Sequence, residues 1–423
     1  MILRGVAIVI PAQIIKLFVS LALQILIARI LLPEGRGLYG VCLAISLALV
    51  ILSYFGNEFG IRHLLVLKRI TSAQALRYLL ITASLSWAAA VTLAFFAIKS
   101  DVWLPDGVTW PLLFLACSLS FCQLITTQIN VYMTLRGQFG SAAILAVAEE
   151  LFKLILAVVL LVRLRTVEAA LLASIIGSSL IAGVSVLFGG FLKKDFKALR
   201  LEDFQTIYGY GVRSLWLNLS NLSNAHLGTL VLSGLMSNAQ IGIYNLAFGL
   251  VARLQVVPDA LNRVLVPASV ARNSEEERLR IIQVSVAGLT LFCLSAAPLL
   301  AAFNKPIFQV MFGTEYIAAG PIAFFLFIGF SCKVIGKPLE AYFLEISGKP
   351  AALGAIQLFA MLMVGILTYL GAEWYGLIGA AVGSSLALIV SSAALLALYA
   401  RSTERRIISL FDFRTLILRM RKP

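Results

Sequence analysis

Two long apolar runs near the start of the chain are joined by the stretch Arg29-Ile-Leu-Leu-Pro-Glu-Gly-Arg-Gly-Leu-Tyr39. Its proline and glycines predict a tight turn, and the Gly-x-Tyr step at its end opens the next apolar run. A second such step, Gly242-Ile-Tyr244, occurs 205 residues later, again between two apolar runs. Two further pairs of segments recur in the same order at similar offsets: Gly177-Ser-Ser-Leu180 with Gly383-Ser-Ser-Leu386, and Leu135-Arg-Gly-Gln138 with Ile346-Ser-Gly-Lys349. These matches predict that the chain is a duplication.

The composition indicates a membrane protein. Hydrophobic residues make up 61% of the chain and charged residues 13%, with a mean hydropathy of +0.97, whereas a soluble domain carries roughly 25% charged residues. A helix needs about 20 mostly apolar residues to cross about 30 Å of hydrocarbon. By this measure we predict about twelve spans, six in each half of the chain: 5–31, 38–61, 75–98, 109–135, 141–162, 167–191, 207–235, 241–266, 281–303, 318–346, 350–371 and 374–400.

The predicted fold is therefore an all-α polytopic membrane protein with about twelve transmembrane helices in two six-helix lobes. Because each half holds an even number of spans, both halves have the same orientation and form a parallel internal repeat. The predicted parts are an N-terminal lobe, a basic linker on the cytoplasmic surface, a C-terminal lobe and an amphipathic cytoplasmic tail: 1–192, 193–206, 207–400 and 401–423.

The formal net charge of +14 follows this topology and does not indicate nucleic acid. Of the 34 lysines and arginines, 23 fall on one set of ends and loops and 6 on the opposite set. Because cations accumulate on the cytoplasmic side of a membrane protein, both termini are predicted to be cytoplasmic. The first apolar run has no small-residue cleavage site, so no cleaved signal peptide is predicted. All five cysteines fall inside spans, which favours packing roles over disulfides or metal sites.

The fifth predicted span carries Glu149, Glu150 and Lys153. Glu149 and Lys153 are four residues apart with the acid first, which is the favourable order for an ion pair on a helix. A structural ion pair and a role in ion coupling both stay open for these residues.

The tenth predicted span places Lys333, Lys337 and Glu340 around Pro338. Their spacing puts all three side chains on one helix face. Two lysines four residues apart repel each other, and each costs roughly 3 kcal/mol at a helix centre on an insertion scale. Glu340 neutralises only one of them, so a second anion is needed, either a protein carboxylate or a substrate.

Two more cations lie inside predicted spans, Lys16 beyond Pro11 in the first and Arg253 before Pro258 in the eighth. Pro258 is also expected to break or kink that span. We predict that four cations converge on a central cavity between the lobes: Lys16, Arg253, Lys333 and Lys337. The alternative, that each pairs with a protein acid, stays open.

Asparagines mark two further candidate sites. In the seventh span, Asn221 and Asn224 lie on one polar stripe, which fits either helix contacts or a wet cavity that binds substrate. Asn57 and Asn262 coincide under the 205-residue offset, so both lobes are predicted to place an amide at a cytoplasmic gate. The alternative for this pair is an ordinary interfacial helix end.

The segments that carry the repeat also carry a family resemblance. The turn Ala28–Gly40 resembles the first inter-helix turn of oligosaccharide flippases, the Wzx-like polysaccharide transporters of the multidrug/oligosaccharidyl-lipid/polysaccharide exporter superfamily. Gly242-Ile-Tyr244 with Ala247 resembles the matching turn of their second lobe, and Gly376-Leu-Ile-Gly379 with Gly383 resembles their last span. The resemblance implies two six-helix lobes, alternating access, and export of undecaprenyl-pyrophosphate-linked sugar units across a bacterial inner membrane.

The interior charges favour the same function. Interior cations outnumber interior acids, and a pyrophosphate is a concentrated anion that such cations would hold while the polyprenyl tail stays in lipid. The expected partners are a lipid-linked oligosaccharide, bacterial membrane lipids, a polysaccharide polymerase and glycosyltransferases. No cofactor or metal is predicted, and coupling to Na+ or H+ stays open. Because the longest outer segment, 304–317, has no catalytic cluster, an enzyme is not predicted. A drug or metabolite exporter of the same fold is the alternative, and a non-transporting member of a polysaccharide assembly complex is the third hypothesis.

Overall fold

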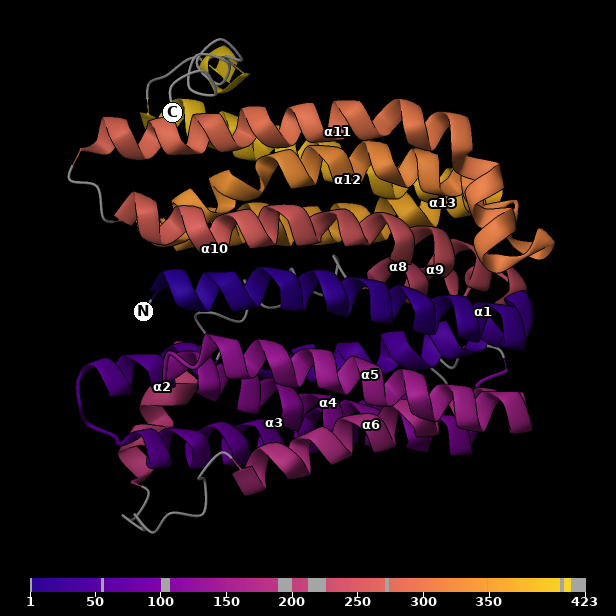
Figure 1. Ribbon diagram of the computed structural model, residues 1–423, viewed down its shortest axis with the longest axis horizontal. Coiled ribbons are helices and arrows are strands. Elements are labelled where there is room, and N and C mark those ends of the chain that lie inside the picture. Colours follow the sequence, from indigo (N-terminus) through magenta and orange to yellow (C-terminus); the bar gives the residue numbers. More distant parts are fainter. Residues whose placement is uncertain are drawn as a thin grey trace. The chain divides into compact units, whose positions relative to one another are not determined.

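The computed structural model describes residues 2–54, 57–99, 107–188, 200–211, 226–270, 274–347, 349–403 and 407–411, and within these ranges the chain forms helices and no strand. Figure 1 shows long helices running side by side within the first part of the chain and, separately, within the second. The described helices include α1 (Ile2–Tyr54), α2 (Asn57–Val66), α3 (Ser72–Lys99), α4 (Trp110–Leu135), α5 (Phe139–Leu164), α6 (Val167–Phe188), α8 (Leu227–Leu232), α9 (Asn238–Ala252), α10 (Val256–Val270), α11 (Glu275–Phe312), α12 (Ala319–Ala341) and α13 (Pro350–Thr403).

The described helices agree with the predicted spans and confirm an all-α polytopic membrane protein. Among the described residues, eight helical segments are long and apolar enough to cross a membrane, one of which, Asn238–Asn262, joins α9 to α10. Two of these, α1 with 53 residues and α13 with 54, are each divided by a kink into two arms of membrane length. The 26-residue α5 matches the fifth predicted span and carries its charged residues. About half of the seventh predicted span, residues 212–225, lies outside the described residues.

The kink of α1 replaces the tight turn expected at residues 29–39. Leu32 is the residue that leaves the helical conformation, with φ 58° and ψ 178°. Pro33 explains the position of this break, because a residue before proline is disfavoured in the α-helical region. Proline itself suits the first turn of a new helix, where its missing N–H has no partner to lose. Arg36 follows within that helix, so it is buried at 3% exposure instead of lying in a loop.

The contacts divide the chain into two compact units, residues 1–242 and 243–423. The predicted division into six-helix lobes at 192 and 207 rests on the count of spans and stays a prediction. In unit 1, α5 packs on α1 and α6, α4 packs on α6 and α1, and α3 packs on α1 and α4. In unit 2, α12 packs mainly on α13 and α11, and it also contacts α10.

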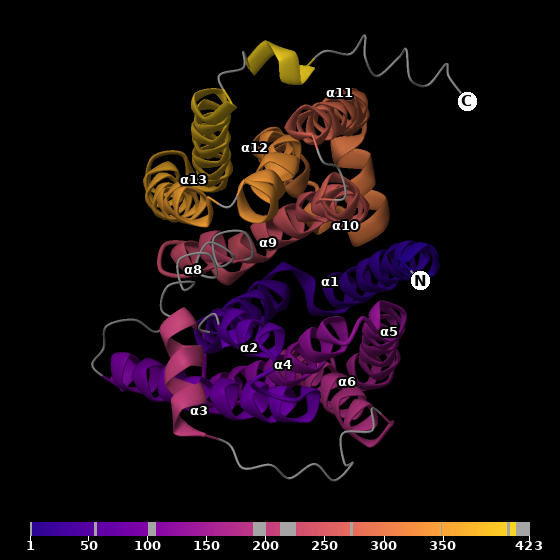
Figure 2. The same ribbon diagram turned by 90° about the vertical axis from the view of Figure 1, so that its left-hand side faces the viewer.

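Residues 201–211 form a helix that belongs to unit 1, and we call it the docked helix. It includes the end of the segment predicted to be a linker. In Figure 2 this pink helix crosses α3 instead of running alongside it. The Tyr78 hydroxyl of α3 accepts a hydrogen bond from the Arg200 N–H and donates one to Asp203, both at 2.8 Å. Ile207 is fully buried against Gly60 of α2, where a side chain would meet the Ile207 backbone at 2.7 Å.

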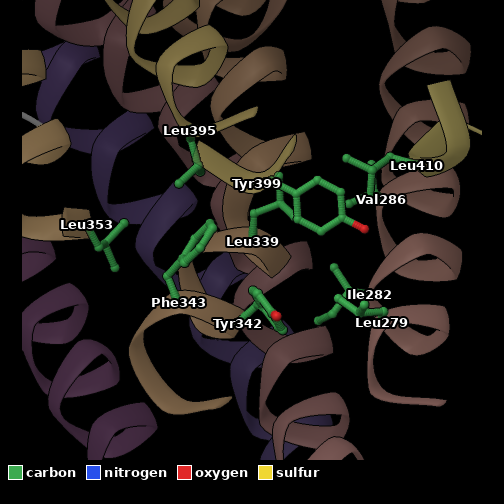
Figure 3. Packing of buried hydrophobic residues seen from close by; sticks show 10 residues of the cluster. All are labelled: Leu279, Ile282, Val286, Leu339, Tyr342, Phe343, Leu353, Leu395, Tyr399 and Leu410. Atoms are coloured by element: carbon green, nitrogen blue, oxygen red, sulfur yellow. The ribbon is translucent and has the colours of Figure 1, made fainter. Parts of the chain in front are cut away.

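One end of unit 2 is held by an apolar cluster (Figure 3). The cluster joins α11, α12, α13 and two short helical turns, η3 (Tyr342–Ile346) and η4 (Ile407–Phe411): its residues are Leu279, Ile282, Val286, Leu339, Tyr342, Phe343, Leu353, Leu395, Tyr399 and Leu410. Leu410 comes from the predicted amphipathic tail and is fully buried, so this part of the tail packs on protein. The tail from residue 412 lies outside the described residues.

The glycines of the two Gly-x-Tyr steps that suggested a duplication meet each other inside unit 1. A Cβ atom on Gly37 of α1 would lie 1.7 Å from the carbonyl oxygen of Asn238, and a Cβ atom on Gly242 of α9 would lie 2.0 Å from that of Pro33. Only glycine allows the backbones to approach this closely. The contact is reciprocal, with the same 205-residue offset between both pairs. The duplication of the whole chain stays a prediction.

Candidate functional site

The charged face predicted for the tenth span is present on α12. The Lys337 ammonium contacts the Glu340 carboxylate at 2.9 Å, and both side chains keep about one fifth of their surface exposed, 22% and 18%. Within the described part of the chain, this is the only hydrogen-bond partner of Glu340. One acid therefore neutralises one of the two lysines, as the spacing predicted.

Lys333 is the unusual member of this face. It is 7% exposed, and among the described residues no carboxylate lies within ion-pair distance of its ammonium. Its charge is felt by Lys337, Glu340 and, from α10, Asp259. Desolvating a charge without a close counter-charge costs several kcal/mol. Lys333 is therefore a buried cation that an external anion would stabilise.

Small residues of α12 bring this face close to α13. A Cβ atom on Gly329 would lie 2.5 Å from the Ser385 backbone, and one on Gly336 would lie 3.4 Å from Leu395. Both glycines share a helix face with Lys333, because they are four residues before it and three after it. The α12 face that carries Lys333 is therefore the face that approaches α13 closely.

Asn262 and Arg253 reach the same region from the helices before α11. Asn262 of α10 donates from Nδ2 to the carbonyl oxygen of Lys337 at 3.4 Å. Arg253 lies in η1 (Arg253–Gln255), the 3-10 turn that separates α9 from α10 and packs against α12. The break predicted from Pro258 is confirmed there. The Arg253 guanidinium donates to the Gly249 carbonyl at 2.6 Å, so part of its hydrogen-bonding capacity caps the end of α9.

A second charge cluster lies inside unit 1, on α5. Lys153 and Glu149 form an ion pair of 2.7 Å with side chains 11% and 12% exposed. The Ser178 hydroxyl of α6 donates to the same carboxylate at 2.9 Å. Gly177, the preceding residue, leaves room for the lysine, because a Cβ atom there would lie 2.8 Å from Lys153 Cγ. The structure thus supports the ion-pair alternative for Lys153 and Glu149.

Of the other predicted site residues of unit 1, Lys16 and Glu150 lie near the Lys153–Glu149 pair, and Asn57 lies on α2. Lys16 of α1 is half-buried and close enough to Glu149 for the two charges to interact, and Glu150 interacts in the same way with Lys153. Asn57 of α2 is 2% exposed, and neither of its amide atoms has a hydrogen-bond partner among the described residues. Its gate role stays a prediction. Asn221 and Asn224 lie outside the described residues.

Several polar residues of the interior were missed by the sequence analysis. Tyr39 lies 3.4 Å from the Ser174 hydroxyl of α6 and packs under the Arg36 guanidinium, 5.3 Å from its ring centre. In unit 2, Tyr244 lies 3.0 Å from the Ser384 hydroxyl of α13. Both tyrosines close a Gly-x-Tyr step, so the repeat itself was the signal that these hydroxyls bind the last helix of their half.

The structure therefore brings Lys333, Lys337, Glu340 and Asn262 together in unit 2, and Lys16, Glu149, Glu150 and Lys153 in unit 1. The convergence of the four cations between the lobes stays a prediction. The described residues contain no group of three or more histidine, cysteine, aspartate or glutamate side chains placed to hold a metal ion. Chemically, the unit 2 cluster is suited to bind an anion through its lysines.

Comparison with known proteins assigns the chain a family and a fold. A family model described as "Polysaccharide biosynthesis protein" matches residues 26–321. A "Putative O-antigen transporter" from Shigella flexneri is 23% identical over 244 residues, which cover 55% of this chain and 57% of that relative. The chain thus matches somewhat more than half the length of this curated relative.

Solved structures share the fold across nearly the whole chain. The lipid II flippase MurJ in an inward closed conformation has a TM-score of 0.74 at 15% identity, covering 98% of this chain and 91% of that one. A multidrug resistance MATE family transporter of the MOP superfamily, in an inward-facing conformation, has a TM-score of 0.69 at 16% identity, covering 93% and 95%. At these identities the likeness shows the fold alone.

Proposed function

Because the chain belongs to the polysaccharide biosynthesis protein family, we propose that it is a flippase that exports undecaprenyl-pyrophosphate-linked oligosaccharide across a bacterial inner membrane by alternating access. The similar proteins are transporters and flippases, which supports the prediction that this chain is not an enzyme. The expected partners remain a lipid-linked oligosaccharide, membrane lipids, and the polymerase and glycosyltransferases of the same assembly.

The substrate proposal rests on the burial of Lys333 without an ion pair. A lysine that is 7% exposed without an ion-pair partner in the described chain is expensive for packing alone. A pyrophosphate supplies several negatively charged oxygens, and Lys337 stands one helical turn away to share them. Lys16 and Arg253 complete the proposed cationic cavity.

The buried lysine of unit 1 differs from Lys333 in having an ion-pair partner, and this contrast supports Lys333 as the substrate-binding residue. There Lys153 already has Glu149, and Ser178 holds that acid in place. Of the two buried lysines among the described residues, Lys333 is therefore the one without an ion pair. An organic-cation exporter, the alternative, would need an acidic site instead, because cations next to Lys333 would be repelled.

The proposal is tested by transport in sealed vesicles that contain the purified full chain and a fluorescent undecaprenyl-pyrophosphate-linked oligosaccharide. We expect the wild-type chain to expose the lipid-linked sugar to a lectin or glycosidase on the far side. Lys333→Gln is expected to reduce this rate at least tenfold, while Lys349→Gln, which removes an exposed lysine of the same unit, is expected to leave it unchanged. Equal rates for Lys333→Gln and wild type would exclude the site, and transport of organic cations instead of the lipid would favour the drug exporter.

A further inference from the structure

We infer that Glu340 is a built-in competitor of the substrate: its carboxylate holds Lys337 when the site is empty and gives it up when a pyrophosphate binds. This inference rests on the proposed function and adds a residue that tunes substrate release. The reason for such a residue is physical. Two lysines in a low-dielectric interior would hold a multivalent anion tightly, and a transporter must also release it.

The geometry of the Lys337–Glu340 pair fits an exchangeable contact. One carboxylate oxygen, Oε2, contacts the ammonium at 2.9 Å, and the two side chains are three residues apart on the helix. Each keeps about one fifth of its surface exposed, so an incoming anion reaches the lysine without unfolding the helix. Among the described residues, no second group fixes the Glu340 carboxylate.

The ion pair of unit 1 shows what a fixed pair looks like in the same chain. The Lys153–Glu149 contact is shorter, at 2.7 Å, and its side chains are only 11% and 12% exposed. Ser178 binds the Glu149 carboxylate as well, at 2.9 Å, and Gly177 fits around the lysine stem. Two features that lock the first pair, a hydroxyl donor and deeper burial, are absent from the described surroundings of the second.

The number of charges on α12 completes the argument. Lys333 and Lys337 are two cations, and Glu340 is one anion bound to the second of them. Asp259 on α10 is exposed and acts on both lysines at longer range. A pyrophosphate that binds Lys333 therefore finds Lys337 already occupied, and it gains that second contact only by displacing Glu340. When the substrate leaves, the Lys337–Glu340 ion pair forms again.

The matching test is binding of farnesyl pyrophosphate, with farnesol as the probe that lacks the anion, to the full chain in lipid nanodiscs. We expect Glu340→Gln to bind farnesyl pyrophosphate about tenfold tighter than wild type, equal to about 1.4 kcal/mol, with slower dissociation. Glu340→Asp, which keeps the carboxylate, is expected to return affinity toward wild type. Glu315→Gln removes an exposed acid of the same unit and is expected to leave affinity unchanged. The double variant Lys337→Gln/Glu340→Gln is expected to lose the gain.

The outcomes separate the inference from the proposed function. Tighter binding by Glu340→Gln together with slower transport would support the competitor role, since a merely structural ion pair would not raise affinity when broken. Equal or weaker binding by a folded Glu340→Gln protein, with wild type binding the probe, would overturn this inference alone. Failure of wild type to distinguish farnesyl pyrophosphate from farnesol would overturn the pyrophosphate site, and this inference with it.

Discussion

Replacing Lys333 by methionine is expected to stabilise the folded protein, whereas the same replacement of Lys153 is expected to destabilise it. The two lysines are matched in burial, at 7% and 9% exposed. They differ in their partners, because Lys153 has Glu149 at 2.7 Å and Lys333 has no ion pair within the described chain. Methionine keeps the length and apolar stem of the side chain, so packing changes little.

The expected magnitudes follow from this difference. A lysine at a helix centre costs roughly 3 kcal/mol on an insertion scale, of which solvent access and distant acids recover a part, so Lys333→Met should stabilise by about 1–3 kcal/mol. Lys153→Met would leave Glu149 as an uncompensated buried charge, and breaking a buried pair in this way costs about 3–5 kcal/mol. The two substitutions should thus move stability in opposite directions.

The assay is reversible unfolding in mixed detergent micelles, followed by circular dichroism, in a buffer without phosphate or pyrophosphate. Farnesyl pyrophosphate should then stabilise wild type by mass action and have no effect on Lys333→Met. Destabilisation of Lys333→Met to the extent seen for Lys153→Met would refute the reasoning, because it would mean that Lys333 has a close acid partner in the folded protein.

Three further outcomes are expected. Gly383→Ala should destabilise the protein by about 1–3 kcal/mol in the same unfolding assay, because its Cβ would lie 2.0 Å from the Leu367 carbonyl oxygen. The control Gly183→Ala, with open space around it, should be neutral or stabilising by up to about 1 kcal/mol. Equal effects of the two substitutions would contradict the close packing at Gly383. In whole cells an impermeant thiol reagent should label a cysteine introduced at position 34 and not one introduced at 195, because of the 23-to-6 distribution of cations. Labelling at 195 and not at 34 would show that the topology is the opposite of the predicted one. Tyr78→Phe should increase protease cleavage of the docked helix, because two hydrogen bonds of 2.8 Å are lost. Unchanged cleavage would show that apolar packing alone holds the docked helix on α3.

The positions of the membrane helices were determined by the sequence itself. Whether a segment spans a bilayer depends on the length and hydropathy of that segment, and both are local properties. Local chemistry also set the breaks: Pro33 places the kink at Leu32, and Pro258 follows the 3-10 turn at Arg253. Helix spacing likewise predicted that Lys333, Lys337 and Glu340 share a face, and that Lys153 and Glu149 can pair.

Which of these charges are satisfied was decided only by the tertiary structure. Lys153 is locked because α6 brings Gly177 to its stem and Ser178 to the carboxylate of its partner Glu149, whereas α13 packs against α12 and brings Lys333 no acid. The docked helix depends in the same way on Tyr78, a residue of another helix. A partner on a distant segment leaves no periodic signal around the residue that it satisfies. The sequence therefore determined where the charges lie along each helix, and the packing between helices decided which of them is left for a substrate.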